Sequence, residues 1–162
     1  MAAFYVEASA IVKHYRSEVG SNVVRELLTA PPVADRFHTS LLSTVEVTSA
    51  TYRQTRTGRI QDRWAQQAMA HFRATVAGHF RIWPLGDGTM ATAVVVAEQH
   101  RLRAGDAIHL ATASGVAALA PQQPLVLVSS DGELLQAAAA AGLAALDPAA
   151  PDAVARLREL RA

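Results

Sequence analysis

The segment 125–128 reads LVLV and limits the possible folds more than any other part of the chain. A half-buried strand alternates apolar and polar side chains, whereas this run is apolar at every position. Strands of that kind lie in the middle of a parallel sheet, because helices cover both of its faces. The run therefore predicts an α/β protein, in which strands and helices alternate along the chain.

The rest of the sequence shows that alternation. Four further strand patterns cover residues 3–6, 36–39, 80–83 and 143–146. Apolar residues at helical spacing predict helices near 10–18, 23–28, 43–57, 60–77, 90–101, 106–119, 134–141 and 152–161. We therefore expect a three-layer α/β/α domain with a mostly parallel sheet of about five strands. The core domain is expected to cover residues 1–148, with 149–162 as a helical extension of the same domain.

Composition excludes several kinds of site. The 162 residues include no cysteine, which excludes disulfides, a thiolate nucleophile and Cys-ligated zinc or iron–sulfur sites. The net charge of +1 is no global sign of nucleic-acid or membrane binding. The N-terminus lacks the features of a signal peptide, and no apolar run is long enough to span a bilayer. We expect a soluble, cytoplasmic protein with no membrane contact.

Four carboxylates stand at predicted strand ends or helix starts. Glu7 directly follows the first strand, and Asp131 follows the LVLV strand after two serines. Glu46 lies in the first turn of the helix after the second strand, and Asp106 begins a helix after Gly105. Ligands of open parallel sheets bind beyond the carboxyl ends of the strands. The four acids are therefore placed to share one pocket.

Most of these acids also have a purely structural explanation. Asp106 fits a helix N-cap, and Asp131 fits a partner of a helix dipole. The pairs Ser43–Glu46 and Ser130–Glu133 fit the capping box S-x-x-E, in which the glutamate serves only its own helix. Glu7 is harder to explain in this way, because an acid that ends a buried strand is poorly placed to reach water.

If the four acids do share a pocket, their mutual repulsion requires a cation. With oxygen ligands alone, the cation would be hard, which favours Mg²⁺ or Mn²⁺. His109 follows Asp106 by one turn, and we interpret it as a packed helix histidine, with contact to the pocket as the alternative. The sequence also contains a basic run, Arg53, Arg56, Arg59 and Arg63. This run fits either a solvated helix face or a surface that contacts RNA.

With these residues placed, the sequence resembles the PIN-domain nucleases, and within them the VapC-type toxins of type II toxin–antitoxin systems. The segments that carry the likeness are FYVEASAIVKHYRSEVGS, STVEVTSATYR, LRAGDAIHLATA and LVLVSSDGELLQAAAAAGL. No single segment is a strong motif, but the ordered set extends from about residue 3 to 148.

The resemblance implies a metal-dependent endoribonuclease that cleaves RNA, such as transfer or ribosomal RNA, with a metal-activated water. The residues that it implies as catalytic Mg²⁺ or Mn²⁺ ligands are Glu7, Glu46, Asp106 and Asp131, with Ser9 and Ser130 as polar neighbours. It also implies a homodimer, inhibited by a small VapB-like antitoxin whose tail enters the active-site groove. Part of an apolar face with Tyr52, Trp64, Met69 and Phe72 is expected to receive the antitoxin or the second subunit.

Glu7 departs from the family, whose first acid is almost always Asp in the pattern D-x-S. The longer side chain adds about 1.5 Å, and Mg²⁺ tolerates little displacement of its ligands. We therefore expect metal binding with reduced activity. Three origins stay open: an active natural variant, a weakened or inactive paralogue, and an engineered change. The alternative function is a catalytically weak or inactive PIN-like module that binds RNA or protein.

Overall fold

The computed structural model describes residues 2–29, 31–32 and 34–162. In these residues, five strands form one sheet in the order β3-β2-β1-β4-β5, and every neighbouring pair is parallel. The strands are β1 (Ala3–Val6), β2 (Arg36–Ser40), β3 (Phe80–Trp83), β4 (Leu125–Val128) and β5 (Ala144–Leu146). The LVLV segment is thus an inner strand, as its sequence predicts.

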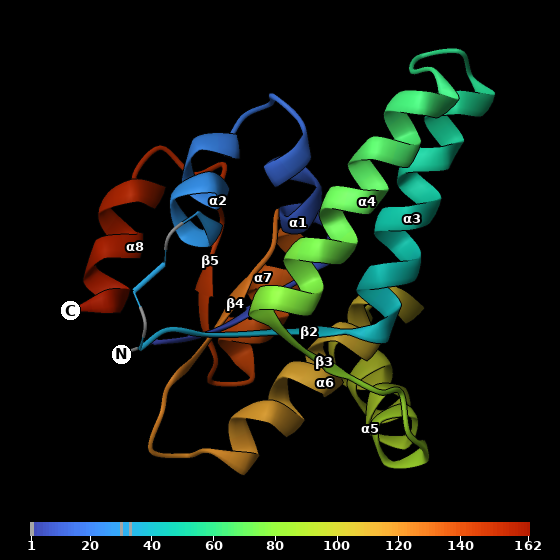
Figure 1. The fold of residues 1–162 in the computed structure, drawn as a ribbon. Helices are drawn as coiled ribbons and strands as arrows, with labels where there is room; N and C mark the ends of the chain where they lie inside the picture. The colour runs from blue at the N-terminus through green and yellow to red at the C-terminus, as the bar shows by residue number, and fades with distance from the viewer. Residues whose placement is uncertain (1, 30, 33) are drawn as a thin grey trace.

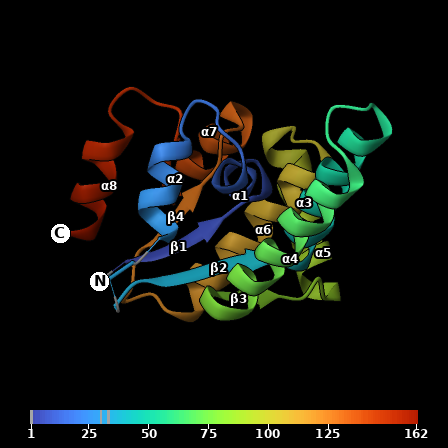
Figure 2. The ribbon, with the colours of Figure 1, turned by 45° about the horizontal axis from the view of Figure 1, so that its top comes forward.

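Helices cover both faces of the sheet (Figure 1 and Figure 2). The first face packs against α1 (Ala8–Tyr15), α2 (Ser21–Leu28), α4 (Asp62–His79) and α8 (Ala153–Arg161). The second face packs against α6 (Ala104–Leu119) and α7 (Gly132–Ala140), while α5 (Asp87–His100) lies on α6. The remaining helix, α3 (Leu41–Arg56), pairs with α4 in a hairpin that extends beyond the sheet. The expected three-layer α/β/α fold is confirmed.

The neighbouring strands β1 and β4 divide their side chains between two cores. Phe4 and Val126 belong to the first core, whereas Tyr5 and Leu127 belong to the second. All four side chains are almost completely buried, and burial of a large apolar side chain contributes about 1.5–3 kcal/mol. The alternation matters for function, because it directs Tyr5 towards α6.

The last helix shares the first core. Leu157 of α8 is fully buried there, and Arg161 donates from Nε to Oδ2 of the buried Asp35 at 2.8 Å. Arg161 also donates to the carbonyl oxygen of Leu27 in α2. None of the helices in the described residues is both long and apolar enough to cross a membrane.

The strand order determines where a ligand can bind. From β1, the chain first adds β2 and β3 on one side and then β4 and β5 on the other. The connections therefore reverse direction between β1 and β4, and in open α/β sheets this point opens a crevice beyond the carboxyl ends of the strands. Glu7 follows β1 and Ser129 follows β4, so both lie at this crevice.

Candidate functional site

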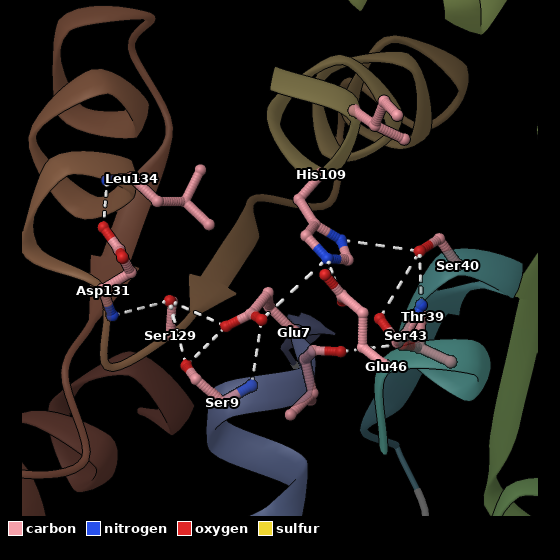
Figure 3. Close-up of polar contacts among 12 residues, drawn as sticks. Glu7, Ser9, Thr39, Ser40, Ser43, Glu46, His109, Ser129, Asp131 and Leu134 are labelled. Carbon is pink, nitrogen blue, oxygen red and sulfur yellow. Dashed lines mark hydrogen bonds and ion pairs between the residues drawn. The ribbon is translucent and has the colours of Figure 1, made fainter. Parts of the chain in front are cut away.

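Acidic side chains from three separate elements meet at this crevice (Figure 3). One ligand atom from each of Glu7, Glu46 and His109 lies within 4.8 Å of the others. Glu7 follows β1, Glu46 belongs to α3, and His109 belongs to α6. Asp106 lies one turn before His109 on α6. The fold therefore brings together residues that are as many as 102 positions apart in the sequence.

Glu7 is buried and serves as the N-cap of α1. Its Oε1 accepts a hydrogen bond from the Ser9 backbone N–H at 2.9 Å. Its Oε2 accepts from the hydroxyls of Ser9 and Ser129, which uses both lone pairs of that oxygen. Oε1 keeps one lone pair and lies 3.9 Å from Nε2 of His109. Ser9 therefore donates to the cap of α1 through both its backbone N–H and its hydroxyl.

Glu46 points into the crevice because α3 begins earlier than its sequence suggests. Ser40 is the N-cap and accepts from the Ser43 backbone N–H at 3.2 Å. Glu46 is therefore in the second turn, so the capping box with Ser43 is wrong. Its Oε2 lies 2.8 Å from Nε2 of His109. The expected contribution of Glu46 to an acidic pocket remains consistent with this position.

Asp106 is the third residue of α6, whose N-cap is Arg103. The interpretation of Asp106 as an N-cap is therefore wrong. Its side chain is partly buried, and desolvation raises the pKa of its carboxyl above the ordinary value. The negative charges of Asp131 and Glu7 raise this pKa further, whereas His109 and Arg103 oppose the shift. The three acids thus share one electrostatic environment.

Asp131 borders the site while capping another helix. Its Oδ1 accepts from the backbone N–H groups of Glu133 and Leu134 at 2.9 and 3.0 Å, so Asp131 is the N-cap of α7. The predicted capping box that starts at Ser130 is wrong for this reason. Asp131 lies outside the tight group of Glu7, Glu46 and His109, although its charge acts on Asp106.

Three serines connect the segments that follow β1 and β4. The Ser130 backbone N–H donates to Oγ of Ser9 at 2.9 Å. Oγ of Ser130 is buried and has no hydrogen-bond partner among the residues that the structure describes. Ser129, which the sequence did not single out, donates to Glu7 and accepts from the Asp131 backbone N–H. Both predicted polar neighbours therefore lie beside the acids.

His109 is the residue that sequence reasoning undervalued. It is buried, as expected for a packed helix histidine, but both of its ring nitrogens contact polar groups. Nε2 contacts Glu46, and Nδ1 lies 3.0 Å from the Tyr5 hydroxyl. The sequence contained one signal for a role of His109 in the site, namely its spacing from Asp106. Residues three apart on a helix share a face, and Asp106 is three residues earlier.

The basic run divides into two parts. Arg53 lines a hollow of about 420 Å³ together with Glu7, Ser9 and Glu46. Arg56, Arg59 and Arg63 are exposed and do not line this hollow. Of the four arginines, only Arg53 therefore lines the hollow with the acids.

The donor set fits a hard divalent cation. Glu7 offers Oε1, and the carboxylates of Glu46 and Asp106 add further oxygens, which are the ligands that Mg²⁺ and Mn²⁺ prefer. The raised pKa of Asp106 also fits, because nearby negative charge is what a cation would compensate.

A family model described as "PIN domain" matches residues 4–140 of this chain. The chain belongs to the PIN domain family. No curated protein sequence matches it closely enough to count as a relative.

Several solved structures share the fold. FitAcB from Neisseria gonorrhoeae has a TM-score of 0.67 at 16% identity, covering 90% of this chain and 97% of its own. A toxin–antitoxin complex from Klebsiella pneumoniae has a TM-score of 0.59 at 18% identity. The match covers 91% of this chain and 98% of the chain from the complex. VapC20 from Mycobacterium tuberculosis, described as a toxin that cleaves the sarcin–ricin loop, has a TM-score of 0.62 at 17% identity, covering 86% and 95%.

The electrostatics of this PIN domain predict that Asp106→Asn stabilises the metal-free protein. The raised pKa means that ionised Asp106 opposes folding. This cost is absent well below the unfolded-state pKa of 3.8, where the carboxyl is protonated in both states. It grows as pH rises above that value and is complete above the higher folded-state pKa. We expect the unfolding midpoint with EDTA to rise by roughly 1–4 °C at pH 7 and the gain to vanish near pH 3.

The matched control for this measurement is Asp87→Asn. Asp87 also lies in the first turn of a helix, α5, but it is exposed. Its carboxylate interacts favourably with the helix dipole, so its removal should leave the midpoint unchanged or lower it slightly. An equal rise in both variants would contradict the repulsion at Asp106.

Proposed function

We propose that this PIN domain is a metal-dependent endoribonuclease toxin. The observation that carries the proposal is the convergence of Glu7, Glu46 and His109 at the reversal point of the sheet, where the charge of Glu7 also acts on Asp106. Membership of the PIN domain family supports a nuclease, and the shared fold with toxin structures supports the toxin class. The cation is proposed to be Mg²⁺ or Mn²⁺.

In this proposal, Glu7, Glu46 and Asp106 hold the cation, with Asp131 as a ligand or a water-mediated partner. When bound, the cation lowers the pKa of an attacking water and stabilises the charge that develops on the phosphate. The chain then needs no side-chain nucleophile. Its own residues orient the carboxylates, and Arg53 lies where it can contact an RNA phosphate at the edge of the hollow.

The proposed substrate is RNA of the transfer or ribosomal class. The description of VapC20 as a sarcin–ricin-loop cleaving toxin supports this class by analogy of fold. Arg56 and Arg59 extend the positive charge from Arg53 along the end of the α3–α4 hairpin and are proposed to contact the RNA backbone.

The proposed inhibitor is a small VapB-like antitoxin. A hollow of about 480 Å³ lies between α1 and the α3–α4 hairpin and includes Trp64, which is 54% exposed. Two buried polar atoms of this hollow, Nδ1 of His14 and the hydroxyl of Tyr15, have no hydrogen-bond partner in the described part of the chain. Met69 and Phe72, which the sequence grouped with this face, belong to the core.

Apolar side chains on another face support the proposed homodimer. Val94 and Val95 of α5 are 61% and 58% exposed. On nearby elements, the large apolar side chains that remain exposed are Leu41 and Val45 of α3 and Ile82 of β3. Exposed apolar groups of this kind favour association with another surface.

The dimer prediction is tested by light scattering after size-exclusion chromatography. We expect a dimer at micromolar concentration and a monomer for the double variant Val94→Glu/Val95→Glu. Leu119→Glu, at a more exposed position (71%) at the C-terminal end of α6, should remain a dimer. A monomeric unsubstituted protein would show the homodimer proposal to be wrong.

RNA cleavage tests the enzyme itself. We expect cleavage that requires Mg²⁺ or Mn²⁺ and falls by about 100-fold or more in Asp106→Asn, because one carboxylate of the site is lost. Asp87→Asn should cleave as the unsubstituted protein does. Glu7→Asp should raise the rate of RNA cleavage by an order of magnitude or more, because it restores the shorter Asp side chain of the family pattern.

The outcomes separate the possible functions. Cleavage that Glu7→Asp does not accelerate would show that Glu7 does not reduce activity. Saturable RNA binding without metal-dependent cleavage, in both the unsubstituted protein and Glu7→Asp, would contradict the enzyme and favour a binding module.

A further inference from the structure

We propose that His109 is a positioning residue that holds the Glu46 carboxylate for the cation and is not itself a metal ligand. The inference rests on the proposed metal site. It matters because Nε2 of His109 is close enough to Glu7 and Glu46 to be mistaken for a third ligand. The contacts on the two sides of the ring distinguish these roles.

The contact with Glu46 determines which ring nitrogen carries hydrogen, because a carboxylate oxygen only accepts, and the Tyr5 hydroxyl is the matching donor on the other side of the ring. The Tyr5 hydroxyl lies 3.0 Å from Nδ1 of His109, and burial raises the pKa of the phenol above its ordinary value. The phenol therefore keeps its hydrogen and can donate it to Nδ1. Nε2 then carries the ring hydrogen and donates to Oε2 of Glu46 at 2.8 Å. A nitrogen that bears hydrogen has no lone pair for a metal ion.

Gly105 limits the other side of the same carboxylate. A Cβ atom at this glycine would lie 3.3 Å from Oε1 of Glu46, which is closer than most contacts of a real Cβ. Glu46 thus has room at Gly105 for its Oε1 and contacts the ring of His109 through its Oε2. Figure 3 shows Glu46 beside His109. Oε2 is bound to the histidine, which leaves Oε1 as the oxygen with the freer lone pairs.

The first two turns of α6 therefore combine three functions in the pattern G-D-x-x-H. Gly105 provides clearance, Asp106 provides a carboxylate, and His109 provides a donor to Glu46. A ring nitrogen that donates to a ligating carboxylate orients it before the ion arrives. Loss of such a partner weakens metal binding by about 10- to 100-fold in known sites.

Nitrogen NMR of the unsubstituted protein, labelled with ¹⁵N-histidine, tests the assignment directly. We expect Nε2 of His109 to carry hydrogen in the metal-free protein and to keep it after Mg²⁺ is added. Loss of that hydrogen, with the ¹⁵N shift of a coordinated nitrogen, would overturn the proposal. Tyr5→Phe should weaken the preference for the Nε2–H form, because Nδ1 loses its donor.

Variants test the consequence for the metal. Calorimetry with Mn²⁺ should show a dissociation constant about 10- to 100-fold higher for His109→Leu. His109→Gln, whose amide N–H can replace the donor, should remain within a few-fold of the unsubstituted protein. Equal losses in the two variants would contradict the positioning role. Thermal unfolding in EDTA checks that each variant folds.

A failure of the proposed metal site would give a different experimental result from a failure of the positioning role. If the unsubstituted protein binds neither Mn²⁺ nor Mg²⁺, the metal-site proposal is wrong and the positioning role falls with it. If the ions bind but Nε2 loses its hydrogen, the metal site stands and only the role of His109 is wrong.

Discussion

Repulsion between carboxylates is the constraint on which the site depends. Burial of the Asp106 carboxyl, together with the negative charges of Asp131 and Glu7, raises the pKa of Asp106, although the three acids belong to different segments of the chain. Such an arrangement works against folding, so it persists only if other interactions offset it or if a cation compensates the charge. Hydrogen bonds to Glu7, the capping role of Asp131 and the contact between Glu46 and His109 provide part of that compensation.

The fold explains why the acids meet. Parallel strands bring all their carboxyl ends to one edge, and the reversal of strand order between β1 and β4 leaves a crevice there. Helices begin directly beyond that edge, and their free N–H groups favour nearby negative charge. Glu7 and Asp131 use these groups as N-caps, so the same side chains that stabilise α1 and α7 also line the crevice. Capping and metal binding are therefore compatible in this site.

Much of the fold was predictable, because the spacing of apolar residues along the sequence indicates the strands and helices. The LVLV run indicates a strand buried on both faces, and β4 is such a strand in an all-parallel sheet. The starts of α3 and α6 were less predictable, since a cap depends on backbone geometry that several neighbouring residues could adopt. For that reason Ser43 was mistaken for the cap in place of Ser40, and Asp106 was mistaken for a cap.

The site was predictable in part. The resemblance to PIN-domain nucleases depends on the order of the acidic segments, and the acids can be read from the sequence. His109 and Tyr5 could not be paired in this way, because they are 104 residues apart and meet only after β1 packs against α6. The role of Ser129 likewise depends on the adjacency of β1 and β4.

Anomalous scattering from a crystal containing Mn²⁺ tests the central claim most directly. The account predicts one ordered Mn²⁺ with oxygen ligands from Glu46, Asp106 and Glu7, at about 2.0–2.2 Å. An anomalous peak elsewhere, or a well-ordered crevice without one at saturating Mn²⁺, would contradict the claim that these acids form a divalent-cation site.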